Sequence, residues 1–584
     1  MNHQKRKDIL TTLISYIFII AVIGIVLYRF LGLYNVQISK YPMYHQAGDA
    51  VTGMVTVKSM MENGWIYDNP YLSAPGTAEN YDAMTMEIFL NLLEKIIVTI
   101  TGNWVLTYNL FYLMGYFLAG FTAFYTLQQL KIPEIIAAPS AVLYALLPYH
   151  QLRGVGHMYL GMYFMVPISV LFLYRLMSND LLFQKGKKGY ITIPNVLRVL
   201  ALMIMSLTGV YYTFFTCFFL CVVILYSLLN KRNWKQIRQA FFSLLVVGGT
   251  IILTSLPNLI YWHNNGKSGA ISKKGPEGAE IYALKIIQLI LPRPNHRYVF
   301  FDKISHFYQV VFPLVNENST ASLGIFMSVG FIILCVALFM SKKLSEDSYI
   351  RIGSILNLAA LLFGTTGGFA VIIAFFTGAI RCYNRFSVFI AMFSLIAIDS
   401  VIMLIWKKWF SQKKWKTVLT AIGMVGIMCC GIVDQIIPEN PGNYDVYAAQ
   451  YESDEAFVKA IESMEASGAM IYQLPYMKYP ENGGINQMPD YSHMSAYLHS
   501  SSLRWSFGAA EGREVDDWQK SVDSLTMKEQ LPIIKEAGFA GIYIDWRAYL
   551  PDEREALEQI FNEEISGDPI LNADGTKAYY SFKE

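Results

Sequence analysis

The chain has 584 residues and a formal net charge of +2, and 54% of its residues are hydrophobic whereas only 15% are charged. This composition, with its positive mean hydropathy, excludes an ordinary soluble enzyme of this length. We expect most of the chain to lie in lipid and none of it to bind nucleic acid.

Apolar segments long enough to cross a membrane recur from residue 9 to residue 437. A hydrocarbon core of ~30 Å requires about 20 apolar residues, and the first segment meets this need. The same segment is too long to be a removable signal peptide. We predict a multi-pass α-helical membrane protein with about eleven spans. The expected spans are residues 9–30, 104–128, 134–149, 158–177, 194–208, 212–230, 239–257, 321–341, 351–364, 386–406 and 416–437.

Clusters of Lys and Arg in short loops predict the orientation, because basic residues are retained on the cytoplasmic side. The cluster Lys5, Arg6 and Lys7 places the N-terminus of this plasma-membrane protein in the cytoplasm. With eleven spans every later cluster is also cytoplasmic, and the C-terminal domain is extracytoplasmic. The later clusters are Lys185, Lys187 and Lys188; Lys231, Arg232, Lys235 and Arg238; Lys342 and Lys343; and Lys407, Lys408, Lys413, Lys414 and Lys416.

The same count of spans assigns residues 31–103, 149–157, 258–320 and 379–386 to the outer face. The first of these segments contains two predicted interfacial helices, over 51–63 and 86–101. A membrane crossing over 86–101 is the alternative, which the charges of Glu87, Glu94 and Lys95 oppose. The third segment contains a predicted apolar helix over 282–291.

A second domain is predicted from about residue 438, where the composition becomes mixed and charged, so that residues 1–437 form the membrane domain and 438–584 a soluble α/β domain. Helical and strand patterns alternate along it. The expected helices are 453–466, 516–537 and 551–561, and the expected strands are 469–474, 539–546 and 578–582.

The first outer loop offers a candidate catalytic base. A general base must be exposed to an incoming hydroxyl, and Asp49 follows Gly48 at a flexible turn just before a predicted helix. The alternative is that Asp49 only caps that helix, since Asp is a favoured N-cap residue. Further along, Asp82 lies in a stretch whose aromatic residues can serve either as sugar platforms or as a membrane-interface belt.

Basic residues gather at two further places on the outer face. Arg381 and Arg385, with Asn384 between them, predict a bound lipid-linked phosphate, because arginine forks match phosphate oxygens bidentately. Snorkelling to anionic headgroups is the alternative. Arg153 and His157 lie in the second outer segment, where phosphate contact or polar packing is favoured, because the spacing of its histidines matches no known metal-ligand pattern.

A third basic turn follows the predicted helix over 282–291. Its residues Arg293, His296 and Arg297 can bracket a second phosphate, with a structural prolyl turn as the alternative. We predict no bound cofactor, with a divalent metal as the less favoured alternative.

In these features the chain resembles the GT-C fold integral-membrane glycosyltransferases, particularly the bacterial branch of YfhO-like proteins. The resemblance covers most of residues 1–437. The segments that carry it are Gly48-Asp49, Ala74-Pro75-Gly76, the turn from Arg153 to His157, the turn from Leu291 to Arg297, and the segment from Arg381 to Arg385.

The resemblance implies a polyprenyl-phosphate-linked sugar donor, transfer on the outer face, and a cell-envelope glycan or polymer as the acceptor. Asp49 then acts as the catalytic base, with Asp82 as a second candidate. Arg381 and Arg385 hold the leaving lipid phosphate and stabilise its charge. A single displacement of this kind inverts the anomeric carbon.

The C-terminal domain is expected to hold the acceptor, with Arg504 and Trp505 contacting saccharide and ordinary domain packing as the alternative. Two other classes of function stay open. A lipid-linked saccharide flippase or transporter needs charged residues inside its spans, and the spans of this chain are almost free of them. A non-catalytic envelope-assembly protein does not depend on Asp49.

Overall fold

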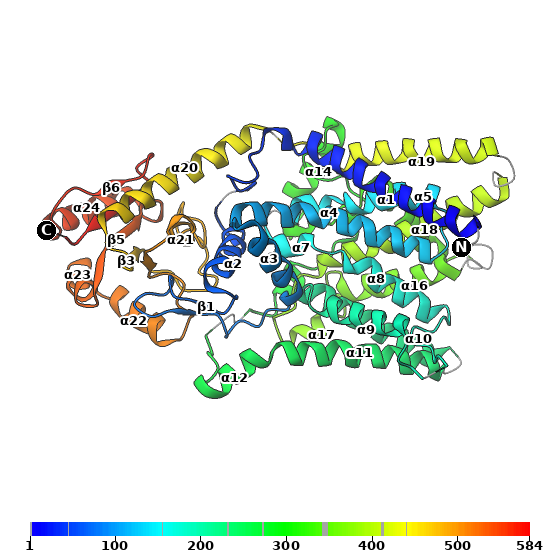
Figure 1. Cartoon of the computed structure of the whole chain (residues 1–584), viewed down its shortest axis with the longest axis horizontal. Helices are drawn as coiled ribbons and strands as arrows, with labels where there is room; N and C mark the ends of the chain where they lie inside the picture. Colours follow the sequence, from blue (N-terminus) through cyan, green and yellow to red (C-terminus); the bar gives the residue numbers. More distant parts are fainter. Residues whose placement is uncertain are drawn as a thin grey trace.

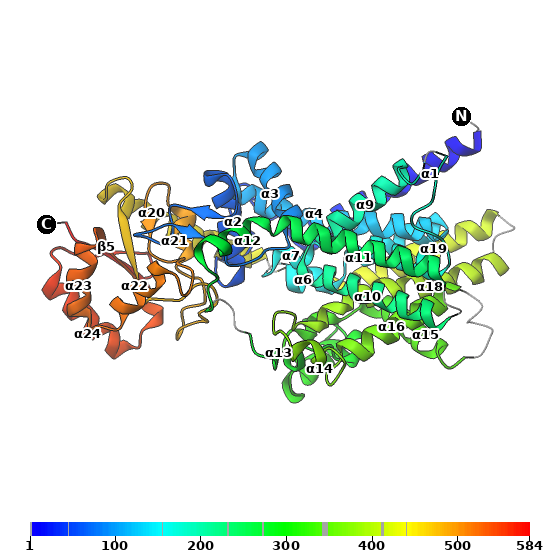
Figure 2. The same cartoon turned by 90° about the horizontal axis from the view of Figure 1, so that it is seen from below.

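The computed structural model describes residues 3–583 apart from residues 45, 155, 188, 231–232, 271–273, 341–347, 410–413 and 440. A long bundle of helices forms one end of the molecule and an α/β domain forms the other, so that the two chain termini lie at opposite ends (Figures 1 and 2). Some of the cations used to predict the orientation lie outside the described residues. These are Lys188, Lys231, Arg232, Lys342, Lys343 and Lys413.

The predicted multi-pass helical fold is confirmed, since a helix occupies each expected span. Among the described residues, seven helical stretches are long and apolar enough to cross a membrane, and the helices at four other expected spans are shorter. The eleven crossings therefore stay a prediction. The helices are α1 (His3–Phe30), α4 (Trp104–Gln129), α5 (Glu134–Ala145), α8 (Met165–Met177), α9 (Ile193–Ser206), α10 (Val210–Leu229), α11 (Trp234–Thr254), α15 (Gly324–Ala337), α16 (Ser348–Gly364), α18 (Ser387–Trp409) and α19 (Lys414–Gln435).

Helix α18 forms the centre of the bundle, and all its residues from Val388 to Ala397 are buried. It packs against α5, α8, α15 and α16. The contact with α15 is close because that helix carries Gly330, where an added Cβ would lie 2.1 Å from the carbonyl oxygen of Ser394. Small residues at such positions let membrane helices approach closely.

The outer segments are folded as well. Helices α2 (Asp49–Asn63) and α3 (Ile88–Thr101) match the two predicted interfacial helices, and α6 (Pro148–Gly154) and α7 (Met158–Gly161) follow α5. The predicted helix over 282–291 is wrong: only Ile286–Leu289 form a short 3-10 helix. The reason is that the preceding residue Leu284 pairs with the turn after α16, donating its N–H to the carbonyl of Gly364 at 2.8 Å.

The predicted boundary at residue 438 falls between α19 and α20 (Pro441–Met464), which leads from the bundle into the C-terminal domain. That domain contains a five-stranded sheet in which β3 is parallel to β4 and β5, whereas β7 is antiparallel to β5 and β6. In sheet order the strands are β4 (Arg504–Trp505), β3 (Met470–Leu474), β5 (Phe539–Asp545), β7 (Lys577–Ser581) and β6 (Ile570–Leu571). The helices after α20 are α21 (Met494–His499), α22 (Glu514–Asp523), α23 (Met527–Glu536) and α24 (Pro551–Glu564).

The first outer loop extends the edge of this sheet. Tyr71 accepts a hydrogen bond from the N–H of Trp505 at 2.8 Å, and the N–H of Ala74 returns one to the carbonyl of Trp505 at 3.0 Å. The N–H of Ser73 donates to the carbonyl of Phe507 at 3.0 Å. Strand β4 therefore does not leave an open edge, which would otherwise be prone to pair with another chain.

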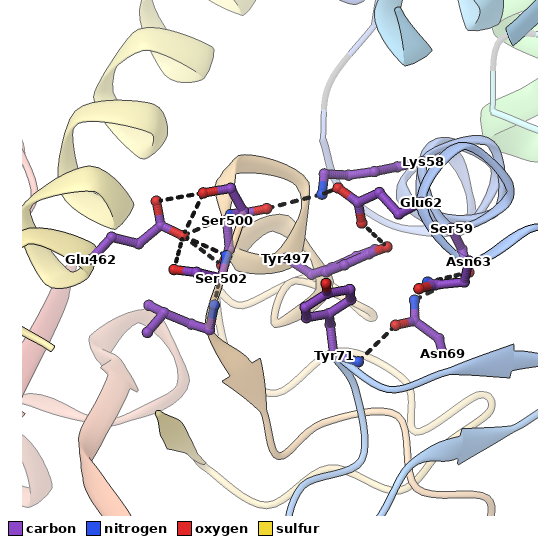
Figure 3. Close-up of polar contacts among 12 residues, drawn as sticks. Lys58, Ser59, Glu62, Asn63, Asn69, Tyr71, Glu462, Tyr497, Ser500 and Ser502 are labelled. Atoms are coloured by element: carbon purple, nitrogen blue, oxygen red, sulfur yellow. Dashed lines mark hydrogen bonds and ion pairs between the residues drawn. The ribbon is translucent and has the colours of Figure 1, made fainter. Parts of the chain in front are cut away.

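Helix α2 is fixed to the C-terminal domain by a buried polar cluster (Figure 3). The hydroxyl of Tyr497 donates to Glu62 at 2.6 Å, and the ammonium of Lys58 binds both Glu62 and the carbonyl of Ser500. Lys58 is only 4% exposed, so its charge depends on these two partners. The cluster therefore sets the position of α2 and of the residue at its start, Asp49.

Candidate functional site

A cavity of about 500 Å³ lies where the helix bundle meets the outer segments. Its walls come from the start of α2, from α7, from the start of α10, from the segment before α18, and from a loop of the C-terminal domain. Its charged and titratable lining side chains include Asp49, Glu87, His157, Lys274, Glu317, Arg381, Arg385 and Glu481.

Asp49 is the first residue of α2 and points to the cavity beside His157. The N-cap position belongs to Gly48, whose positive φ of 58° suits glycine, so the alternative of Asp49 as an N-cap is wrong. The N–H of Gly48 donates to the carbonyl of Asp490 at 3.1 Å, which ties this turn to the C-terminal domain. The imidazole Nδ1 of His157 lies 3.3 Å from Oδ2 of Asp49.

The protonation of this pair follows from its surroundings. Burial lowers the pKa of His157 to about 4, so the ring is neutral at pH 7. Partial burial, with Glu481 and Asp490 nearby, raises the pKa of Asp49 above its usual value. A neutral imidazole with its proton on Nδ1 can donate to the Asp49 carboxylate and keep it oriented. Asp49 is half-exposed, so its second oxygen can receive a proton from a bound hydroxyl.

Two arginines share one carboxylate at the side of the cavity. Glu317 lies 2.5 Å from Arg153 and 3.8 Å from Arg385, both measured between a guanidinium nitrogen and a carboxylate oxygen. Burial would raise the pKa of Glu317, but the two guanidiniums outweigh it and hold that pKa below its usual value. The three side chains carry a net charge of +1, which leaves the cluster attractive to an anion.

The cations of the predicted phosphate site are held by aromatic faces. The guanidinium of Arg385 lies 4.0 Å from the ring centre of Tyr211, and that of Arg381 lies 5.3 Å from the ring centre of Tyr282. Stacking leaves the edge of a guanidinium free to donate hydrogen bonds. Within the described part of the chain, Nε of Arg385 and the side-chain amide of Asn384 are buried without a hydrogen-bond partner.

A buried acid lies beneath the cavity wall formed by Tyr159. The Tyr159 hydroxyl is 2.9 Å from both Asn91 and Glu94. Glu94 is fully buried, and burial raises its pKa to about 8. The carboxyl is therefore largely protonated at pH 7 and adds no negative charge beside the anion-attracting cluster.

A loop of the C-terminal domain contributes Glu481 to the lining of the cavity. Lys274 of the third outer segment lies 2.8 Å from Glu481 of that loop, and both side chains line the cavity. The structure thus brings four of the predicted site residues to one cavity: Asp49, His157, Arg381 and Arg385. Arg153 does not line the cavity but forms an ion pair with Glu317, which does. Sequence reasoning missed Glu317, Tyr211, Lys274 and Glu481, because the role of each depends on which outer loops meet. The signal available for Glu317 was an acid in a predicted outer segment.

Asp82 lies outside this cavity and is fully paired. Arg513 donates to both of its oxygens at 2.7 Å, and the Trp262 indole donates to it at 3.1 Å. The backbone N–H of Ser268 makes a further contact at 3.3 Å. With a side chain 2% exposed and both oxygens used, Asp82 joins the first loop to the C-terminal domain and is not placed to act as a base.

The turn with Arg293 is also separate from the cavity. The Arg293 guanidinium donates to the backbone carbonyls of Asp434 and Ile436 at 2.9 and 2.7 Å, and to two carbonyls of its own turn. His296 lies 3.3 Å from the Asp434 carboxylate, and Arg297 stacks over the ring of Phe30 at 4.6 Å. These contacts match the structural-turn alternative, because they join the third outer segment to the ends of α19 and α1.

The predicted acceptor-binding pair is used for packing as well. Arg504 donates to the carbonyls of Pro70, Pro75 and Gly76 at 3.2, 3.0 and 2.6 Å. Trp505 is completely buried in β4. Both residues hold the first outer loop against the sheet, so neither presents a surface to a saccharide.

The residues that the structure describes contain no group of three or more His, Cys, Asp or Glu side chains arranged to hold a metal ion. The expectation that no metal is bound stays a prediction.

No protein-family model and no curated protein matches the sequence. The archaeal oligosaccharyltransferase AglB from Archaeoglobus fulgidus, in complex with an inhibitory peptide and a dolichol-phosphate, aligns over 100% of this chain and 75% of its own, with 12% identity and a TM-score of 0.44. The apo form of the Archaeoglobus fulgidus oligosaccharyltransferase aligns over 91% of this chain and 69% of its own, with 12% identity and a TM-score of 0.44. The arabinofuranosyltransferase AftD from Mycobacteria aligns over 97% of this chain and 41% of its own, with 10% identity and a TM-score of 0.44. These scores lie below 0.5, so function must be argued from the cavity, and the YfhO-like branch stays a prediction.

Proposed function

We propose that this chain is an inverting membrane glycosyltransferase of the GT-C type, which transfers a sugar from a polyprenyl-phosphate donor to a cell-envelope glycan or polymer at the outer membrane face. The observation that carries the proposal is the meeting of Asp49 with Arg381 and Arg385 in one cavity at the end of the bundle. A half-exposed carboxylate in the same cavity as two guanidiniums provides a base for an incoming hydroxyl and a site for a leaving phosphate.

The reaction is a single displacement. The acceptor oxygen attacks the anomeric carbon and its proton passes to the Asp49 carboxylate, while the bond from the anomeric carbon to the phosphate oxygen breaks. The lipid phosphate leaves with the electron pair of that bond, and Arg381 and Arg385 stabilise its charge. His157 keeps Asp49 in position through the contact at 3.3 Å.

A carrier for lipid-linked saccharide remains the alternative class. Such a protein needs ionisable residues along its path, and the buried carboxylate of Asp399 in α18 is the place to look. Asp399 is completely buried, accepts a hydrogen bond from Ser140 at 2.7 Å, and does not line the cavity. This position suits helix packing better than transport.

The proposal is tested by analysing cell-surface glycans of a deletion strain that carries the wild type or one variant. We expect one sugar to be lost in the deletion strain and in Asp49→Asn and Arg385→Ala strains at normal membrane abundance of the protein. Asp68→Asn is the matched control, because this acid lies in the same loop outside the cavity and pairs with Tyr81. Full rescue by Asp49→Asn would exclude the transferase mechanism and favour the carrier or assembly class.

A further inference from the structure

A second large cavity, of about 910 Å³, lies at the opposite end of the bundle from the candidate catalytic site. It is formed by α9, by the beginning of α11, and by residues 181–185 and 190–191 of the loop before α9. Helix α11 begins at the end of the bundle where α1 also begins, away from the C-terminal domain (Figures 1 and 2). The positive clusters of the sequence predict that this end is cytoplasmic.

The lining of this cavity is mainly apolar. Val196, Leu200 and Phe242 line it and remain 45%, 46% and 44% exposed. Two of its polar side chains already form hydrogen bonds with the loop. Gln239 accepts one from the backbone N–H of Phe183 at 3.1 Å and donates one to the carbonyl of Phe183 at 2.8 Å. Asn195 likewise donates to two backbone carbonyls of the loop, at 2.8 and 2.7 Å. An apolar chain would therefore find a matching surface here.

The charged residues that line the cavity, within the described part of the chain, are all cationic. They are Lys185, Lys235 and Arg238. Lys235 and Arg238 are three residues apart on α11 and so lie on one face of the helix. Trp234 beside them is 57% exposed, as expected for a side chain at a membrane–water interface.

We propose that this cavity binds an anionic glycerophospholipid of the cytoplasmic leaflet. The phosphate is held by Lys235, Arg238 and Lys185, and one acyl chain lies along Val196, Leu200 and Phe242. Charge complementarity selects the anionic headgroup, and the apolar wall selects a lipid over a free anion. The site is separate from the cavity with Asp49 and does not depend on the proposed transferase activity.

The test uses the full-length protein in detergent micelles and native mass spectrometry. Phosphatidylglycerol and phosphatidylcholine with identical acyl chains are added in equal amounts. We expect the wild type to retain phosphatidylglycerol selectively, and the double variant Lys235→Gln/Arg238→Gln to lose about tenfold or more of that selectivity, because each lost cation removes a favourable headgroup interaction. The matched control, Lys407→Gln/Lys408→Gln, removes two charges from the same predicted membrane face outside the cavity and should retain selectivity.

A second pair of variants keeps the cations of the cavity and changes its apolar lining. Leu200→Trp narrows the cavity beside the predicted acyl chain and should weaken retention of the lipid, whereas Leu197→Trp, on the same helix but not lining the cavity, should not. Glycerol phosphate at millimolar concentration should fail to displace the lipid, and displacement would indicate a site for free anions. Equal retention of both lipids by the wild type, or unchanged selectivity in Lys235→Gln/Arg238→Gln, would overturn the proposal. Melting temperatures without added lipid identify any variant that is misfolded.

Discussion

The imidazole Nδ1 of His157 lies 3.3 Å from the carboxylate of Asp49, across the mouth of the cavity. The two residues are over a hundred positions apart and come from different outer segments: Asp49 is the first residue of α2, and His157 directly precedes α7. Because burial keeps His157 neutral, the contact orients the Asp49 carboxylate without neutralising it. A carboxylate held in this way can accept a proton in one defined direction.

Replacing Asp49 by Asn should abolish most of the transfer while leaving the fold intact, because the side chain is half-exposed and the amide is isosteric. A positioned general base contributes about 10²- to 10⁴-fold to a rate, so a loss in this range is expected. The measurement is transfer by purified protein in nanodiscs once the donor is identified. Asp68→Asn should retain wild-type activity, and an equal loss in that control would argue against a specific role for Asp49.

The pH dependence of transfer should report the surroundings of Asp49. The active form is the carboxylate and its pKa is raised, so activity should fall on acidification at a higher pH than an ordinary Asp would give. Glu481 raises this pKa and Lys274 lowers it. The acid limb of kcat/KM should therefore move to lower pH in Glu481→Gln and to higher pH in Lys274→Gln. Shifts in the same direction would contradict the assignment of the limb to Asp49.

Arg385→Lys should lose transfer activity despite keeping the positive charge. The guanidinium stacks on Tyr211 at 4.0 Å and presents a planar fork, which an ammonium cannot reproduce. We expect weaker binding of undecaprenyl phosphate, about tenfold or more, measured by native mass spectrometry. The same change at Arg297, which stacks on Phe30 away from the cavity, should leave this binding unchanged. Equal binding by Arg385→Lys and the wild type would place the phosphate elsewhere.

Glu317→Gln should destabilise the protein by about 3–5 kcal/mol, because it leaves the charges of Arg153 and Arg385 buried without a counter-ion. The lowered pKa of Glu317 means that its stabilising effect is present at neutral pH and is lost as the pH falls through that pKa. The difference in apparent melting temperature between variant and wild type should therefore shrink on acidification. Glu277→Gln, an exposed acid of the same outer segment, serves as the control.

Arg513→Ala should weaken the attachment of the C-terminal domain. It removes the bidentate partner of Asp82, whose side chain is only 2% exposed, and leaves that carboxylate with neutral donors alone. We expect a lower apparent melting temperature and faster proteolysis near residue 82, with about 3–5 kcal/mol lost. The double variant Arg513→Ala/Asp82→Ala should be less destabilised than the single one. A double variant that is worse than either single change would contradict the ion-pair account.

The sequence predicted the helices of the bundle well, because apolar length and charge-free composition are strong signals in lipid. The same signal failed over 282–291, where an apolar run pairs with the turn after α16 and forms only a short 3-10 helix. Membrane-interface segments can be apolar without being helical when another segment supplies their hydrogen bonds.

The site was harder to predict than the fold. Arg381 and Arg385 stood out because basic residues at the outer end of a span are uncommon, and Asp49 because it follows a glycine at a turn before a predicted helix. Asp82 and Arg504 looked equally available. Whether an exposed-looking charge has a partner depends on which loops meet: Asp82 is occupied by Arg513 from a distant part of the chain. Such pairings over hundreds of residues leave no local pattern in a single sequence.

The strip of residues 71–74 along β4 has a consequence for how the protein is made. Arg504 contacts Pro70 across 434 positions, so the loop leaves the ribosome long before the strand it borders. In the predicted orientation, this strip reaches the outer face before the later spans are inserted, and its pairing is completed only after the C-terminal domain has been made. A nascent chain arrested before residue 504 would present an unpaired backbone edge to chaperones and proteases of the envelope, which gives the cell a way to recognise incomplete copies.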